Sequence, residues 1–171
     1  ITSIGDYVLE EACRQCRYWN EHGIPDFHIN VNLSVVQLLQ KDVAETVARI
    51  LKKTGVNPKN IVLEITESFA INDMDRVLDI IKGIKKLGPR IALDDFGTGY
   101  SSLAREKELS VDCLKIDKYF IDKLLDADLS KAITSDIISM SHKLGHCTIA
   151  EGVEHECQLQ YLQEHNCDRI Q

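Results

Sequence analysis

Residues 93–102 read LDDFGTGYSS, an apolar strand end followed by two acidic residues and a glycine-containing segment. Arg90 to Leu93 form a strand pattern, and Leu93 leads directly into Asp94 and Asp95. Two neighbouring carboxylates at the end of an apolar strand repel each other unless a cation lies close to both. This stretch therefore predicts a strand whose carboxyl end carries a cation-dependent site.

Strand and helix patterns alternate on both sides of this stretch. Strands are predicted at residues 27–33, 61–65, 90–93, 113–116, 147–150 and 168–171, and helices at 1–21, 35–53, 74–87, 101–108, 131–144 and 156–165. This alternation predicts an α/β fold in which helices cover a parallel sheet. A doubly wound sheet and a (β/α)8 barrel both fit, although no G-x-G-x-x-G follows the first strand, which weighs against a dinucleotide-binding fold.

Polar residues interrupt strands that are otherwise apolar. Asn32, Glu64 and Lys115 each lie between two apolar residues. Because side chains alternate along a strand, the apolar neighbours point toward the helices and the polar residue points inward. Barrel enzymes keep their chemistry at the carboxyl ends of the strands, so we expect these three residues to converge there with Asp94 and Asp95.

Each polar residue also has a structural explanation when it is taken alone. Asn32 could cap a helix, and Lys115 could form a salt bridge with Asp94 or Asp117. As a set they are harder to explain in this way, because burying separate unpaired polar groups would cost several kcal/mol each. Convergence on one site is therefore the preferred interpretation.

The side chains that would converge offer oxygen atoms as metal ligands: Asn32, Glu64, Asp94 and Asp95. Oxygen-only ligand sets suit Mg²⁺, Mn²⁺ or Ca²⁺ better than zinc. Adjacent aspartates allow one carboxylate to bridge two ions, and two close ions can clamp the attacking and leaving oxygens of a phosphodiester displacement. Lys115 could then stabilise phosphate charge or orient the attacking water.

Composition excludes other classes of function. The chain has 171 residues and a net charge of −7, which argues against binding a nucleic acid polymer through its backbone. Its apolar runs are too short for a transmembrane helix. Six cysteines are present, but the C-x-x-C at Cys13 and Cys16 lies in a helical pattern without a second pair at zinc-like spacing. Cys113 and Cys147 open short apolar runs, so we expect reduced, buried cysteines and a reducing cytoplasm.

The strings at the strand ends are similar to those of one family. They are VNLS at 31–34, LEITES at 63–68, LDDFGTGYSS at 93–102, LKID at 114–117, AEGVE at 150–154 and CDRIQ at 167–171. In this order they resemble the successive motifs of the EAL-domain cyclic di-GMP phosphodiesterases, across the whole chain. The resemblance implies a (β/α)8 TIM-like barrel of the EAL type, with about six of its eight strands in this chain.

The resemblance also implies roles for the metal-site residues. Asn32, Glu64 and Asp94 would hold a first metal ion. Asp94 would bridge to a second ion, completed by Asp95. The implied metals are Mg²⁺ or Mn²⁺, with Ca²⁺ expected to be inhibitory.

Further roles follow from the same resemblance. Lys115 and Glu151 would be catalytic and would position and activate the attacking water, while Gln171 and Asp117 would contact water or substrate. Glu67 would anchor the loop at residues 96–102, which is also expected to form a homodimer contact. Glu154 would support Glu151.

Two departures from the family pattern concern the ends of the chain. No Glu-Ala-Leu occurs anywhere in it, and the Gly-Tyr and closing helix expected after Gln171 are absent. We therefore expect residues 1–171 to be a partial EAL domain that lacks N-terminal strands and the C-terminal helix. Such a segment, expected to come from a larger multidomain or membrane-anchored protein, can be inactive by itself.

The function that this resemblance implies is hydrolysis of cyclic di-GMP to linear pGpG in bacterial second-messenger signalling. The alternative is a catalytically inactive domain that binds cyclic di-GMP or a protein partner, as family members with lost ligands do. Every metal-ligand position of the family that falls within this chain carries the family's residue, which favours the enzyme. An unrelated barrel enzyme, such as an enolase-like lyase, would not explain DDFGTGYSS.

Overall fold

The computed structural model describes residues 2–67, 74–97, 109–125 and 128–171. The predicted helix at 101–108 lies outside these residues, as does most of the loop at 96–102. None of the helices in the described ranges is long and apolar enough to cross a membrane.

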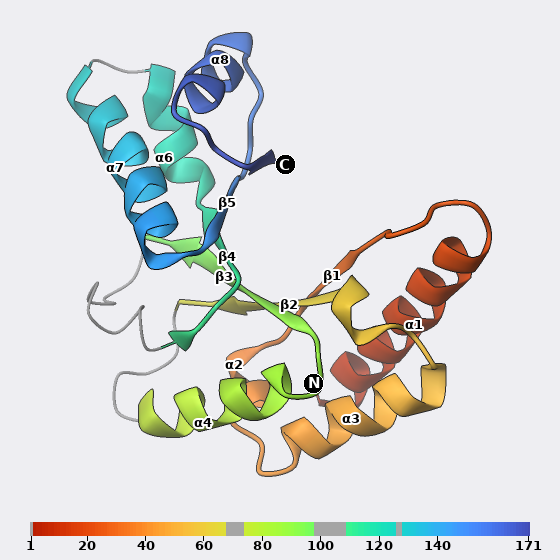
Figure 1. The fold of residues 1–171 in the computed structure, drawn as a ribbon. Helices are drawn as coiled ribbons and strands as arrows, with labels where there is room; N and C mark the ends of the chain where they lie inside the picture. The colour runs from red at the N-terminus through yellow and green to blue at the C-terminus, as the bar shows by residue number, and fades with distance from the viewer. Residues whose placement is uncertain (1, 68–73, 98–108, 126–127) are drawn as a thin grey trace.

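Six parallel strands form one sheet whose spatial order follows the chain. They are β1 (Ile29–Asn32), β2 (Ile61–Thr66), β3 (Arg90–Phe96), β4 (Cys113–Ile116), β5 (Cys147–Ala150) and β6 (Arg169–Ile170). A doubly wound sheet would reverse its order at a switch point, and this sheet does not. The sheet curls as part of a barrel with its helices outside (Figure 1), so the predicted barrel class is confirmed.

The helices divide between the two halves of the sheet. They are α1 (Thr2–Glu21), α2 (Val35–Leu38), α3 (Val43–Thr54), α4 (Met74–Lys85), α6 (Lys118–Asp122), α7 (Asp128–Leu144) and α8 (Glu156–Glu164), with 3-10 turns at Pro58–Asn60 and Lys123–Leu125. In Figure 1, α1, α3 and α4 lie beside the half of the sheet that begins the chain, and α6, α7 and α8 lie beside the other half.

Two helical segments differ from the sequence-based prediction. The single helix expected at 35–53 is two helices, because Ser34 and Gln37 form a capping box around the short α2 and a new helix begins after Asp42. The segment that contains α6 was not predicted to be helical. Asp117 begins this helix by accepting a hydrogen bond from the backbone N–H of Tyr119, and five residues are too few for periodicity to reveal.

The inner face of the sheet has an apolar floor beneath a polar layer. Val62, Ala92, Cys113 and Ile149 form a small buried cluster of their own on four neighbouring strands. Two residues further along each of these strands, or just past its end, stand Glu64, Asp94, Lys115 and Glu151. Because residues i and i+2 share a face of a strand, the apolar floor places these four polar groups on the inside of the curled sheet.

A disulfide joins Cys113 on β4 to Cys147 on β5. The two residues are paired in the register of the parallel strands, with Cα atoms 4.4 Å apart, a separation that a disulfide can span. The expectation of reduced, buried cysteines is therefore wrong for this pair. It holds for Cys13 and Cys16, whereas Cys157 is free but exposed and Cys167 is free and half-buried. The disulfide also removes the support that cysteine usage gave to a reducing compartment. In the sequence, Cys113 and Cys147 each have the pattern of a small core residue. The register of β4 and β5 is what brings them together.

Candidate metal centre and active site

Lys115 lies at the centre of the polar layer. Its ammonium nitrogen is 3.0 Å from Glu64 Oε1 and 3.1 Å from Asp94 Oδ1, and it also pairs with Glu151. Only 3 % of its side chain is exposed. Burial of the ammonium opposes its charge, but the hydrogen bonds to Glu151 and Glu64 outweigh burial and raise the pKa of Lys115 above its ordinary value. Lys115 is therefore a buried permanent cation.

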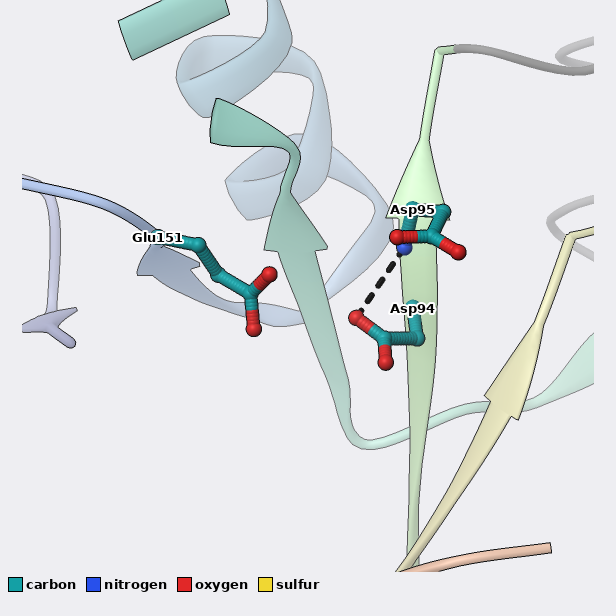
Figure 2. Close-up of side chains that lie close together, drawn as sticks. All are labelled: Asp94, Asp95 and Glu151. Atoms are coloured by element: carbon teal, nitrogen blue, oxygen red, sulfur yellow. Dashed lines mark hydrogen bonds between the residues drawn. The ribbon is translucent and has the colours of Figure 1, made fainter. Parts of the chain in front are cut away.

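Three carboxylates converge beside this lysine. Asp94, Asp95 and Glu151 each offer an oxygen atom, and these atoms all lie within 4.8 Å of one another. Figure 2 shows the side chain of Glu151, from the segment after β5, directed toward the two aspartates on β3. The backbone N–H of Asp95 donates a hydrogen bond of 3.0 Å to Asp94 Oδ1.

An irregularity in β3 explains how two consecutive aspartates reach the same site. In a regular strand their side chains would point to opposite faces of the sheet. The register between β3 and β4 shifts between Leu93 and Phe96, and Asp95 has a φ of 57°. A bulge of this kind redirects side chains next to functional sites. Both carboxylates consequently face Glu151.

The carboxyl group of Asp95 is in an environment that disfavours its negative charge. Burial raises its pKa above the ordinary value, and the charges of Asp94 and Asp117 raise it further, while Lys115 partly offsets them. A divalent cation beside these oxygens would stabilise the ionised carboxylates. The donor set consists of hard oxygen ligands, so the residues present fit Mg²⁺ or Mn²⁺.

Two asparagines of β1 lie next to this cluster. Asn32 is paired in register with Glu64 of the neighbouring strand. Asn30, two residues earlier, donates a hydrogen bond of 2.7 Å from Nδ2 to Glu64 Oε1. The sequence analysis did not select Asn30. Asn30 could have been predicted to face the site, because it lies two residues before Asn32 and shares its strand face.

Glu67 connects the end of β2 to the segment after β3. Its carboxylate Oε2 accepts a hydrogen bond of 2.9 Å from the backbone N–H of Gly97, and its own N–H donates to the carbonyl of Asp94 at 3.1 Å. Glu67 is buried. These bonds lie at the start of the loop at 96–102, of which residues 98–102 are outside the described residues.

The remaining predicted residues lie outside the cluster of Asp94, Asp95 and Glu151. Asp117 caps α6 and contributes to the electrostatics of Asp95. Glu154 is exposed and pairs with Lys118 at 2.9 Å, a contact that sequence reasoning missed. The backbone of Gln171 accepts a hydrogen bond from Gly152 and donates one to Ala150. Gln171 thus holds the segment that carries Glu151 through its main chain.

The fold and the site together define a class: a parallel α/β barrel with carboxylates, a buried lysine and asparagines at the carboxyl ends of its strands. The EAL domain model matches residues 1–171, and the chain belongs to the EAL domain family. The family predicted from the strand-end motifs is therefore confirmed.

Individual relatives agree with this assignment. The chain is 40% identical over all its residues to the bifunctional diguanylate cyclase/cyclic di-GMP phosphodiesterase MucR of Pseudomonas aeruginosa, and 39% identical to the signaling protein YkoW of Bacillus subtilis. It covers 25% of the first and 21% of the second. The chain thus spans about a quarter or less of these curated relatives.

Solved structures show the same fold. The PaMucR phosphodiesterase, in a complex with c-di-GMP, matches with a TM-score of 0.94 and 40% identity, over 99% of this chain and 68% of that one. The EAL domain of Mycobacterium smegmatis DcpA matches with a TM-score of 0.92 and 36% identity, over 98% of this chain and 75% of that one.

Proposed function

We propose that this chain is part of an enzyme that hydrolyses cyclic di-GMP to linear pGpG with two Mg²⁺ or Mn²⁺ ions, in bacterial second-messenger signalling. The observation that carries the proposal is the convergence of Asp94, Asp95 and Glu151 beside the buried Lys115. The likeness to a phosphodiesterase solved with c-di-GMP supports the choice of substrate.

The proposed metal ligands are the oxygen donors at the strand ends. Asn32, Glu64 and Asp94 would hold one ion, and Asp94 and Asp95 the other. The bound ions would supply Lewis acidity at the phosphodiester and lower the pKa of the attacking water. These carboxylates would fix the positions of both ions, because each comes from a strand of the sheet.

The proposed catalytic residues are Lys115 and Glu151. Glu151 would accept the proton of the attacking water as the new P–O bond forms and the bond to the leaving ribose oxygen breaks. Lys115 would donate hydrogen bonds to the charge that develops on the phosphate, and it stays protonated because carboxylates surround it. Gln171 and Asp117 would contact substrate or water, and Glu154 would support the segment that carries Glu151.

We extend the proposal to the whole protein. Residues 1–171 would form part of an EAL domain within a longer, multidomain or membrane-anchored chain that acts in the bacterial cytoplasm. The domain would form a homodimer through the region of residues 96–102. Sedimentation of the full-length protein, with and without substitutions in this loop, tests the dimer.

The function is tested by incubating the full-length protein with cyclic di-GMP and separating the products. Hydrolysis to pGpG with Mg²⁺ or Mn²⁺, its loss in excess chelator and its inhibition by Ca²⁺ are expected. Asp95→Asn should abolish most of the turnover, whereas the same change at the exposed Asp79 on α4 should not. Full activity in chelator would contradict the two-metal proposal.

One observation favours the alternative of a silent receptor. Lys115 already compensates the charges of Glu64, Asp94 and Glu151, so the carboxylates have an internal cation. A receptor would bind cyclic di-GMP in chelator and release it unchanged after prolonged incubation with Mn²⁺. An enzyme would convert it, so product analysis after this incubation separates the two functions.

A further inference from the structure

The side chain of Asn30 contacts a proposed metal ligand from the neighbouring strand. Its Nδ2 donates a hydrogen bond of 2.7 Å to Glu64 Oε1. An ionised carboxylate only accepts hydrogen bonds, so the asparagine must present its amide nitrogen here. The ammonium of Lys115, from β4, lies 3.0 Å from the same oxygen.

These two donors distinguish the two oxygens of Glu64. A carboxylate oxygen has two lone-pair positions, and Asn30 and Lys115 approach Oε1 from different strands. Among the described residues, both side-chain contacts of this carboxylate end on Oε1. The other oxygen, Oε2, is thereby left to accept a different ligand.

Asn30 also limits the competition from Lys115. A carboxylate that is free to rotate beside an ammonium can offer it both oxygens, and each such contact removes a position that a metal ion would need. The amide of Asn30 prevents this rotation by holding Oε1 from β1. Because the amide is neutral, it adds no charge that would repel a cation.

We propose that Asn30 is a positioning residue that orients Glu64 so that Oε2 faces a divalent metal ion. This role rests on the proposed function and adds a residue to its machinery. Asn30 touches the ligand rather than the ion, and residues in such positions around metal sites affect metal affinity by about 10- to 100-fold.

The test measures Mn²⁺ binding directly, by calorimetry and by the paramagnetic resonance signal of free Mn²⁺, in the full-length protein. Asn30→Ala should weaken Mn²⁺ affinity by about 10- to 100-fold. Asn30→Gln should recover part of it, because its longer side chain keeps an amide nitrogen that can donate to Oε1. Turnover at saturating Mn²⁺ should change less than the Mn²⁺ concentration that gives half-maximal activity.

Asn20→Ala is the matched control. Like Asn30, Asn20 uses its side-chain amide as a donor: its Nδ2 donates to the carbonyls of Cys16 and Phe27, and its Oδ1 accepts from the backbone N–H of Phe27. These contacts tie α1 to the segment before β1, so this variant should lower the melting temperature and leave Mn²⁺ affinity unchanged.

The outcomes separate this role from the proposed function. If the wild type binds Mn²⁺ and hydrolyses cyclic di-GMP while Asn30→Ala binds Mn²⁺ equally well, the positioning role is wrong and the function stands. If Asn30→Ala and Asn20→Ala both lose Mn²⁺ affinity only in proportion to their loss of thermal stability, Asn30 is a structural residue. A wild type that neither binds Mn²⁺ nor turns over substrate overturns the function and the role of Asn30 with it.

Discussion

The carboxylate of Glu67 accepts a hydrogen bond from the backbone N–H of Gly97, over a distance of 2.9 Å. Gly97 is two residues beyond Asp95, and the N–H of Glu67 donates to the carbonyl of Asp94. One residue at the end of β2 thus holds the backbone on both sides of the candidate ligand Asp95. The position of the Asp95 carboxylate therefore depends on Glu67, which is not itself in the metal cluster.

Glu67→Ala should therefore weaken the activation of the enzyme by Mg²⁺, so that a higher Mg²⁺ concentration is needed for the same rate, while the fold is preserved. Gly97 is exposed, so water can replace the acceptor that its N–H loses, and the loss of this hydrogen bond should lower the free energy of unfolding by about 1 kcal/mol. A small displacement of Asp95 can reduce turnover by roughly a hundredfold. The measurement is a Mg²⁺ titration of rate with a thermal melt, and Glu67→Gln, which keeps an acceptor, is the control. A Glu67→Ala variant that titrates like wild type would exclude this role.

Lys115→Met should reduce turnover by about a hundredfold or more, since it removes a donor aimed at developing charge. Binding of cyclic di-GMP should change less, because this contact strengthens mainly in the transition state. The variant should also be less stable in chelator, where Glu64, Asp94 and Glu151 lose their common cation.

Mn²⁺ should restore more thermal stability to Lys115→Met than to the wild type, because the metal supplies the missing positive charge. Rate, affinity and melting temperature are measured in parallel. Lys52→Met, at an exposed position of α3, provides the control for charge removal outside the cluster. Weak substrate binding with an unchanged rate would show that Lys115 has a different role.

Reduction of the Cys113–Cys147 disulfide should lower the free energy of unfolding. The residues are 34 positions apart. In the chain-entropy account, closing a loop of that length stabilises the folded state by about 4 kcal/mol. Denaturant unfolding of the wild type with and without reductant measures the effect, and Cys113→Ala/Cys147→Ala should match the reduced protein.

Cys157→Ala is the control for the disulfide, because this thiol is free and exposed. It should unfold like the wild type under both conditions. Identical unfolding of the wild type with and without reductant would mean that the two cysteines are not bonded in solution.

Stability should also fall in mild acid because of His146. Burial lowers the pKa of this imidazole below 6.5, and the positive charge of Lys85 adds to the shift, while the carbonyl of Val111 and Asp112 oppose it. Below pH 6.5 the unfolded chain binds a proton that the folded chain does not yet bind. The free energy of unfolding therefore decreases as the pH falls from about 6.5 toward the folded pKa.

His146→Gln keeps a hydrogen-bond donor without a titrating ring, so its stability should depend less on pH in this range. Denaturant unfolding between pH 7 and pH 5 measures the slope. Equal slopes in wild type and His146→Gln would show that another group controls acid stability.

Sequence patterns predicted an α/β fold, and the strand-end motifs predicted the barrel type and the family. Polar residues such as Glu64 and Lys115 inside apolar strands predict a site on the inner face of the sheet, because side chains alternate along a strand and the apolar neighbours occupy the outer face. The order of the strand-end motifs was sufficient to name the EAL family. These features are local in the chain, so they can be recognised in the sequence without the structure.

Contacts that depend on strand register and backbone geometry could not be predicted from the sequence. The bulge at Asp95 turns two consecutive carboxylates to one side, and the Cys113–Cys147 bond exists because β4 and β5 align those positions. The contact of Asn30 with Glu64 likewise joins residues 34 positions apart. No local pattern encodes such contacts, because each depends on how neighbouring parallel strands are aligned after the intervening helices have packed.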